Sequence, residues 1–241
     1  MGRGITKWNY LLLAPVLLSV LLAACGTELI KTRFSGGPDD LDPKLRNTVI
    51  NIATTSDTNS VTLNAILVYI IEEGYGYSTQ VVTLSDAEIH EALKSGRVDV
   101  ALAVKQPGNG WFDGAVAAGE VIDSGPAYDL DGHTYNSALS SGLEVKAAEL
   151  VPMLKNFNIL HRRLKATDDW FKANPELGTK RAAVYFLWNY NFEDGWKFWM
   201  PYDPAERVRR AMEVFTGLTS SDPYRGYEID RNAPGGGTGN N

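Results

Sequence analysis

The residues that most often carry catalysis are few in this chain and stand far apart. Its three histidines are His90, His133 and His161, and no two of them have the spacing of a metal site. No Gly-x-Ser-x-Gly motif is present to expose a nucleophilic serine, and the glycine-rich stretch 108–114 lacks the Lys-Ser/Thr pair of a phosphate loop. We therefore expect a protein that is not an enzyme and that has no metal site and no cofactor.

Aromatic side chains are concentrated near the C-terminal end. Between residues 188 and 202 the chain contains Trp188, Tyr190, Phe192, Trp196, Phe198, Trp199 and Tyr202. Aromatic rings can enclose a quaternary ammonium group by cation–π attraction, at roughly 0.5–2 kcal/mol per ring. Helices this rich in aromatics are more often part of a core or of a surface that docks a partner. We expect core or interface here, and a ligand cage is the alternative.

Five predicted elements alternate between strand and helix from Thr48 to Val104. The strands are 48–54, 79–84 and 97–104, which are β-branched and apolar, and the helices are 59–76 and 85–96. Ser85 and Glu88 form a capping box at the start of the second helix. This alternation predicts right-handed crossovers and a parallel sheet covered on both faces. Ligands of such sheets bind at the carboxyl ends of the strands, near residues 55–57, 84–86 and 105–111.

The rest of the chain turns from strands to helices. We expect a short helix at 114–119, a fourth short strand at 121–123 and a loop at 135–142, followed by C-terminal helices. The last helix is expected at 203–217, with Asp203 as its N-cap and Gly217 as its end. The whole is one α/β domain over residues 47–218, followed by a flexible tail at 219–241 whose end is rich in glycine and asparagine.

The N-terminal segment has the pattern of a lipoprotein signal peptide. Arg3 and Lys7 precede an apolar run over 10–22, which closes on Leu-Ala-Ala-Cys with Cys25 as the chain's single cysteine. Cleavage after residue 24 would leave Cys25 carrying a diacylglyceryl group, and residues 25–46 would form a flexible tether. An uncleaved membrane helix is the alternative, although the apolar run is short for a span. We expect an extracytoplasmic protein anchored to a membrane, on the periplasmic side or at the cell surface.

Composition sets further bounds. At 241 residues with 44% hydrophobic residues, the chain can bury a sizeable core. Its net charge of −6 argues against a nucleic-acid partner, which requires a basic surface.

Two stretches carry a resemblance to a known family. The segment 50–104 runs from "INIATTSDTNS" to "LKSGRVDVALAV", and the segment 181–212 begins "RAAVYFLWNYN". Both resemble the substrate-binding proteins of glycine betaine, choline and proline betaine ABC transporters. The resemblance implies a periplasmic-binding-protein-like lobe with a short, mostly parallel sheet flanked by helices and followed by C-terminal helices. It also implies a small-molecule ligand and an ABC permease as partner.

The chain departs from this family in two places. Family members insert a second lobe of about a hundred residues between the fourth strand and the C-terminal helices, where this chain has only residues 129–142. They also tend to place a Trp-Pro pair after the Val-Asp-Val motif, where this chain has Lys105-Gln106-Pro107. A lysine at this position repels a quaternary ammonium, so the second departure bears on the ligand.

The resemblance leads to one function and one alternative. The first is a lipid-anchored solute-binding protein of an ABC transporter for quaternary ammonium or related small solutes. Its pocket would be bordered by Thr55, Ser56, Asp57, Gln106, Trp111 and Tyr128. Asp57 is the candidate counter-charge for a cation, and a helix N-cap is an equal alternative for it. The other function is a degenerate lobe that serves as a structural or assembly subunit of a membrane complex. In either case a membrane partner could dock through Trp188, Trp196 and Trp199.

Overall fold

The two most deeply buried strands lie side by side at the centre of the sheet. In the computed structural model, which describes residues 43–55, 58–106, 110–130, 132–190 and 195–219, these strands are β1 (Val49–Thr54) and β3 (Val100–Gln106). Ile50, Ile52 and Val100 have no exposed surface. β-branched side chains suit this position because they pack well on a pleated surface. β1 pairs in parallel with both β3 and β2 (Ser78–Thr83), as the strand–helix alternation predicted.

The other half of the sheet is antiparallel. In the described part of the chain the strand order is β2-β1-β3-β5-β4, with β4 at Val121–Leu130 and β5 at His133–Ser140. β5 runs antiparallel to both β3 and β4. The fourth strand is thus longer than the expected residues 121–123. The loop expected at 135–142 is wrong, because most of that stretch is β5.

A tight turn joins β4 to β5. Leu130 and His133 face each other across the pair, so only two residues, 131 and 132, make the connection. Gly132 has φ 76°, a left-handed conformation that the turns of two-residue hairpins require and that glycine adopts without steric cost. The chain therefore returns directly to the sheet. This is the place where members of the resembled family carry a second lobe, which this chain was expected to lack.

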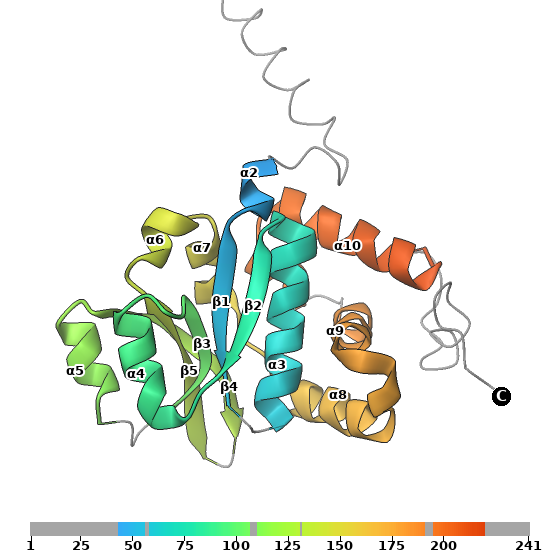
Figure 1. Ribbon diagram of the computed structural model, residues 1–241. Helices are drawn as coiled ribbons and strands as arrows, with labels where there is room; N and C mark the ends of the chain where they lie inside the picture. Colours follow the sequence, from blue (N-terminus) through green and yellow to red (C-terminus); the bar gives the residue numbers. More distant parts are fainter. Residues whose placement is uncertain (1–42, 56–57, 107–109, 131, 191–194, 220–241) are drawn as a thin grey trace, which may run out of the picture. The chain divides into compact units, whose positions relative to one another are not determined.

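Helices cover both faces of the sheet (Figure 1). On one face, α4 (Asp86–Lys94) and α5 (Phe112–Ala117) pack on a cluster that includes Ala53, Ala101 and Ala138. On the other face a larger cluster joins the sheet to the remaining helices. These are α3 (Thr58–Tyr69), η1 (Ile70–Tyr75), α6 (Leu143–Lys146), α7 (Leu150–Asn156), α8 (His161–Ala173), α9 (Gly178–Asn189), η3 (Trp196–Trp199) and α10 (Tyr202–Thr216). Two short helices complete the described chain, α2 (Pro43–Arg46) and η2 (Pro175–Leu177).

Of the three predicted capping residues, at α4 and at the two ends of α10, the structure agrees with the sequence-based prediction for two. The backbone N–H of Ser85 donates to Glu88 Oε2 at 2.9 Å, which confirms the predicted capping at α4. Gly217 ends α10 with φ 72°, also as predicted. Asp203 is not the N-cap of α10, because the helix begins at Tyr202 and Pro201 holds the cap position. The carboxylate of Asp203 lies in the first turn, where a negative charge still favours the helix dipole.

The long helix after β1 changes from α-helical to π-helical hydrogen bonding before it ends. α3 continues into the π-helical segment η1, and Gly76 ends it with φ 81°. Gly74 in this segment allows α10 to pack closely, since an added Cβ would lie 3.0 Å from Val208 Cγ2. Arg207 Nε donates to the carbonyl oxygen of Gly74 at 2.6 Å. The π-helical turn is thus the docking point of α10.

Asp99 connects the central strands. Its backbone N–H donates to the carbonyl of Asn51, and its own carbonyl accepts from Ser140 N–H. Its carboxylate Oδ2 accepts from Asn51 N–H at 2.7 Å and from Lys146 Nζ at 2.6 Å. Asp99 is 3% exposed, and a buried carboxylate is tolerated only when it is paired in this way. One residue therefore joins β1, β5 and α6 at the start of β3.

We expect Asp99→Ala to lower the free energy of unfolding by about 3 kcal/mol, because it leaves Lys146 and the Asn51 amide without their acceptor. Urea unfolding followed by circular dichroism measures this difference. The control is Asp113→Ala, at an exposed aspartate of α5, and it should cost no more than about 0.5 kcal/mol. Equal losses in the two variants would contradict the role given to Asp99.

Candidate ligand-binding edge

The carboxyl ends of three strands meet at one edge of the sheet. Thr55 follows β1, Gln106 ends β3, and Tyr128 lies near the end of β4, which runs in the same direction as β3 because both are antiparallel to β5. The β4–β5 turn lies at this same edge. The topology thus brings three of the predicted site residues to the edge where sheets of this kind bind ligands. Ser56 and Asp57 lie outside the described residues, so the two alternatives for Asp57 stay predictions.

Gln106 has an unused hydrogen-bond donor. Its side chain is half-buried, and its Nε2 atom is buried with no hydrogen-bond partner among the described residues. A buried donor without a partner is costly, so such a group is suited to a ligand that accepts a hydrogen bond. Lys105 beside it is exposed and lies opposite Tyr135 on β5. The end of β3 therefore offers an amide donor on one face of the strand and a positive charge on the other.

Tyr128 belongs to the face of the sheet that packs on α3 and α9. It is 1% exposed, and its ring stacks on that of Tyr135 with centroids 4.6 Å apart and planes 3° apart. Tyr135 is half-buried and lies directly opposite Tyr128 across the β4–β5 pair. The pair places two parallel rings near the edge, with Tyr128 as the buried member.

Trp111 lies on the opposite face, where α4 and α5 pack. Its indole stacks on the His90 ring with centroids 4.6 Å apart and planes 7° apart, and it meets the buried Phe112 edge-on. His90 Nε2 lies 3.4 Å from Glu120 Oε2, and Lys94 Nζ lies 2.7 Å from Glu120 Oε1. The hydrogen bond from Lys94 lowers the pKa of the Glu120 carboxyl, which keeps it charged beside His90. The structure thus does not bring Trp111 and Tyr128 into one aromatic cage.

The C-terminal aromatic block is mainly core. Trp196 is 1% exposed and donates from Nε1 to the carbonyl of Leu187 at 2.7 Å. Trp199 is 8% exposed and packs on Phe157 with centroids 4.7 Å apart. The expectation that a partner docks through these two tryptophans is therefore wrong, because their rings are occupied inside the domain. Trp188 is half-buried, and the exposed aromatics of the block are Phe198 and Tyr202.

Two residues of the edge were missed by the sequence analysis. Tyr135 was placed in a loop, although the Asp131-Gly132 pair before it is a typical signal of a two-residue hairpin. His90 was counted among scattered surface histidines. Its contact with Trp111 has no signal in the sequence, because His90 lies on α4 and Trp111 precedes α5, twenty-one residues further along the chain.

The sheet order, the helices on both faces and the ligand edge define one lobe of a periplasmic-binding-protein-like fold. Residues 48–201 match the family described as the substrate binding domain of ABC-type glycine betaine transport systems. The chain belongs to this family. It is a shortened member that lacks most of the second lobe, whose place is taken by the turn between β4 and β5.

Solved structures with the same fold come from the same class of proteins. An ABC-transporter choline binding protein in complex with choline is similar over 71% of this chain and 100% of its own, with a TM-score of 0.58 and 11% identity. The glycine betaine/L-proline-binding protein ProX from Borrelia burgdorferi is similar over 66% of this chain and 99% of its own, with a TM-score of 0.57 and 10% identity. Lactococcal OpuAC, in its closed form with glycine betaine, covers 64% of this chain and 100% of its own, with a TM-score of 0.55 and 10% identity.

No curated protein sequence matches the chain. Within the described ranges, no helix has both the length and the apolar character that crossing a membrane requires.

The stack between His90 and Trp111 can be tested by mutation, since it connects α4 to the residue that precedes α5. We expect His90→Leu to lower the free energy of unfolding by about 1 kcal/mol and to shift the fluorescence of Trp111 to longer wavelength, because the indole loses its stacking partner. The Trp111 signal is obtained by subtracting the spectrum of a Trp111→Phe variant. Glu91→Ala, at an exposed residue of the same helix, is the control and should change neither quantity. An unshifted Trp111 spectrum in His90→Leu would show that the stack does not form.

Proposed function

We propose that this protein is the lipid-anchored, extracytoplasmic solute-binding component of an ABC transporter for glycine betaine or a related small solute. Family membership supports the class. The observation that supports a ligand at the sheet edge is Gln106, whose buried Nε2 lacks an acceptor among the described residues. A carboxylate oxygen is a stronger acceptor for this amide donor than a hydroxyl oxygen, because a hydrogen bond to a charged group is the stronger one. The proposed ligand is therefore a zwitterionic betaine rather than choline, which has no carboxylate.

The single lobe limits how tightly such a ligand can bind. With no second lobe to enclose it, each cation–π contact is worth only about 0.5–1 kcal/mol. Trp111 and Tyr128 belong to clusters on opposite faces of the sheet, and even two or three such contacts would supply at most about 3 kcal/mol before the cost of lost translational freedom. Millimolar affinity requires about 4 kcal/mol. We therefore place the dissociation constant of the isolated chain above about 1 mM.

Titration with glycine betaine up to about 50 mM, followed by amide chemical shifts in nuclear magnetic resonance, tests this function. We expect shifts confined to residues at the ends of β1, β3 and β4, smaller shifts with choline, and their loss in Gln106→Leu. Val145→Ala, at a residue that is 92% exposed on α6, is the control and should leave the titration unchanged. No shifts with either compound would reject the solute-binding role.

The alternative function is that of a structural or assembly subunit of a membrane complex. The observation that favours it is the two-residue β4–β5 turn, since it removes the lobe that encloses ligand in two-lobed proteins. If the titration shows no binding, this alternative becomes the better account. Its docking surface would then include the exposed Phe198 and Tyr202 rather than the buried tryptophans.

The proposed anchor is tested separately. We expect Cys25→Ser to leave the precursor uncleaved and without acyl groups, because the thiol is the site of diacylglyceryl transfer. Mass spectrometry of the membrane fraction measures both changes, and Thr27→Ser, which leaves the motif intact, is the control. Cleavage of the serine variant at the same site would contradict the lipoprotein assignment.

A further inference from the structure

An apolar groove lies between β2, the outermost strand on one side of the described sheet, and the helices α3 and α9. It has a volume of about 290 Å³ and is formed by β2, by α3 with the start of η1, and by the start of α9. Its apolar lining consists of Val61, Ala65, Val68, Tyr69 and Val81. β2 is an edge strand in the described sheet, and Val81 on it is 47% exposed. Edge strands are normally covered or charged, and an exposed apolar side chain in a groove indicates that something covers it.

The hydroxyl of Tyr69 lacks a hydrogen-bond acceptor among the described residues, which an occupant of the groove could supply. The residue is 3% exposed, and its hydroxyl is buried with no hydrogen-bond partner among the described residues. Burial raises the pKa of this phenol, so it remains a donor at neutral pH. Lys180 Nζ lies 5.5 Å from the centre of the Tyr69 ring and also lines the groove. An occupant should therefore combine apolar side chains with a hydrogen-bond acceptor.

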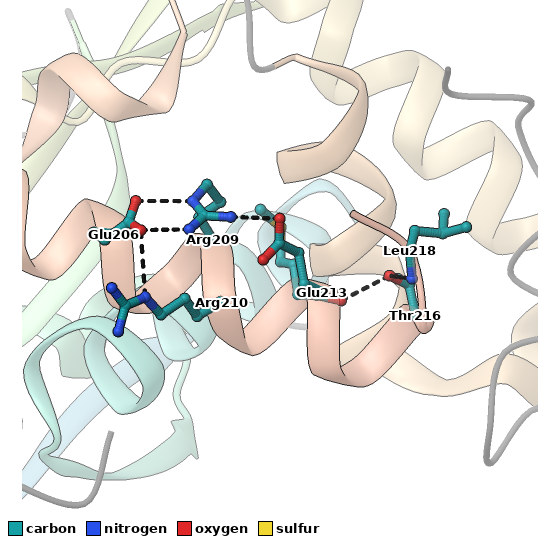
Figure 2. A network of polar contacts seen from close by, with 7 residues as sticks. Glu206, Arg209, Arg210, Glu213, Thr216 and Leu218 are labelled. Atoms are coloured by element: carbon teal, nitrogen blue, oxygen red, sulfur yellow. Dashed lines mark hydrogen bonds and ion pairs between the residues drawn. The ribbon is translucent and has the colours of Figure 1, made fainter. Parts of the chain in front are cut away.

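The end of α10 lies beside this groove. Lys180 Nζ, which lines the groove, is also 5.6 Å from the centre of the Phe215 ring in the last turn of α10. Beyond that turn, Thr216 Oγ1 donates to the carbonyl of Met212 at 2.8 Å and accepts from Leu218 N–H at 3.2 Å. Figure 2 shows Thr216 and Leu218 at the end of the helix, following the ion pairs of Arg209 with Glu206 and Glu213. The chain therefore leaves α10 close to the groove.

We propose that residues 220–231 of the same chain occupy this groove. The segment begins three residues beyond Gly217, the C-cap of α10, and spans up to roughly 40 Å when extended. It contains Tyr224, Tyr227 and Ile229 as apolar side chains, and the carboxylates of Asp222, Glu228 and Asp230 as acceptors. Because the segment is tethered at Leu218, its effective concentration at the groove is in the millimolar range. A modest intrinsic affinity is then sufficient for docking within one molecule.

A double-mutant cycle tests the proposal, with the thermal unfolding midpoint as the readout. The parent is the chain from residue 25 to 241 with Cys25→Ser, and it is compared with a version that ends at Thr219. We expect the truncation to lower the midpoint by about 4 °C. In Val81→Asp, which places a charge in the groove, the truncation should have almost no further effect. Val49→Asp is the matched control on β1, since Val49 is 39% exposed and does not line the groove, and there the truncation should lower the midpoint in full.

Other occupants give different results. If truncation has the same effect in Val81→Asp as in Val49→Asp, the tail does not lie in the groove and the proposal is overturned. If the effect of truncation disappears on dilution of the protein, a second copy supplies the segment, which also overturns docking within one chain. A peptide of residues 220–231 added to the truncated protein should restore the midpoint, and Tyr227→Ala in that peptide should weaken the recovery.

Discussion

The buried carboxylate of Asp99 is the interaction on which the arrangement of the sheet depends. Parallel strands have no hairpin to set their register, so β1 and β3 need another constraint. Asp99 supplies it by holding the Asn51 amide with its side chain and the Asn51 carbonyl with its backbone. Its contacts with Ser140 and Lys146 add β5 and α6 to the same point. The Val-Asp-Val motif is therefore a structural motif here, and it fixes the start of the strand that ends in Gln106.

This constraint explains how the domain can exist without a second lobe. The strands that would lead into that lobe are β4 and β5, of which β5 pairs with β3 and β4 pairs with β5. A two-residue turn closes them because Gly132 accepts the left-handed conformation. The core clusters on the two faces of the sheet consist mainly of residues from its strands and from the helices that cover it. The short connection between β4 and β5 therefore leaves the packing of the described domain intact.

Much of the fold followed from local sequence, and much of the site did not. The unit from β1 to β3 was predicted because apolar periodicity and capping agree over residues 48–104. Strand β5 was not predicted, because its small polar residues have a low strand propensity on their own. Ser137 and Ser140 are almost fully buried only because β3 and β4 flank them. The edge positions of Thr55 and Gln106 followed from topology, whereas the position of the Trp111 ring depends on its contact with His90 on α4.

The buried and exposed aromatics show that folding and recognition use different residues. Trp196 and Trp199 fill the core between η3, α7 and α9, and their burial contributes to stability through area removed from water. A ring cannot supply this stabilisation and also meet a partner, because the same surface would have to be covered twice. Trp111 is only half-buried, and its stack on the His90 ring and its edge-on contact with Phe112 hold it on the α4–α5 side of the sheet. If a ligand binds at the sheet edge, as proposed, Gln106 offers it a buried hydrogen-bond donor that no described residue uses, whereas Trp111 and Tyr128 belong to clusters on opposite faces of the sheet and do not form one cage.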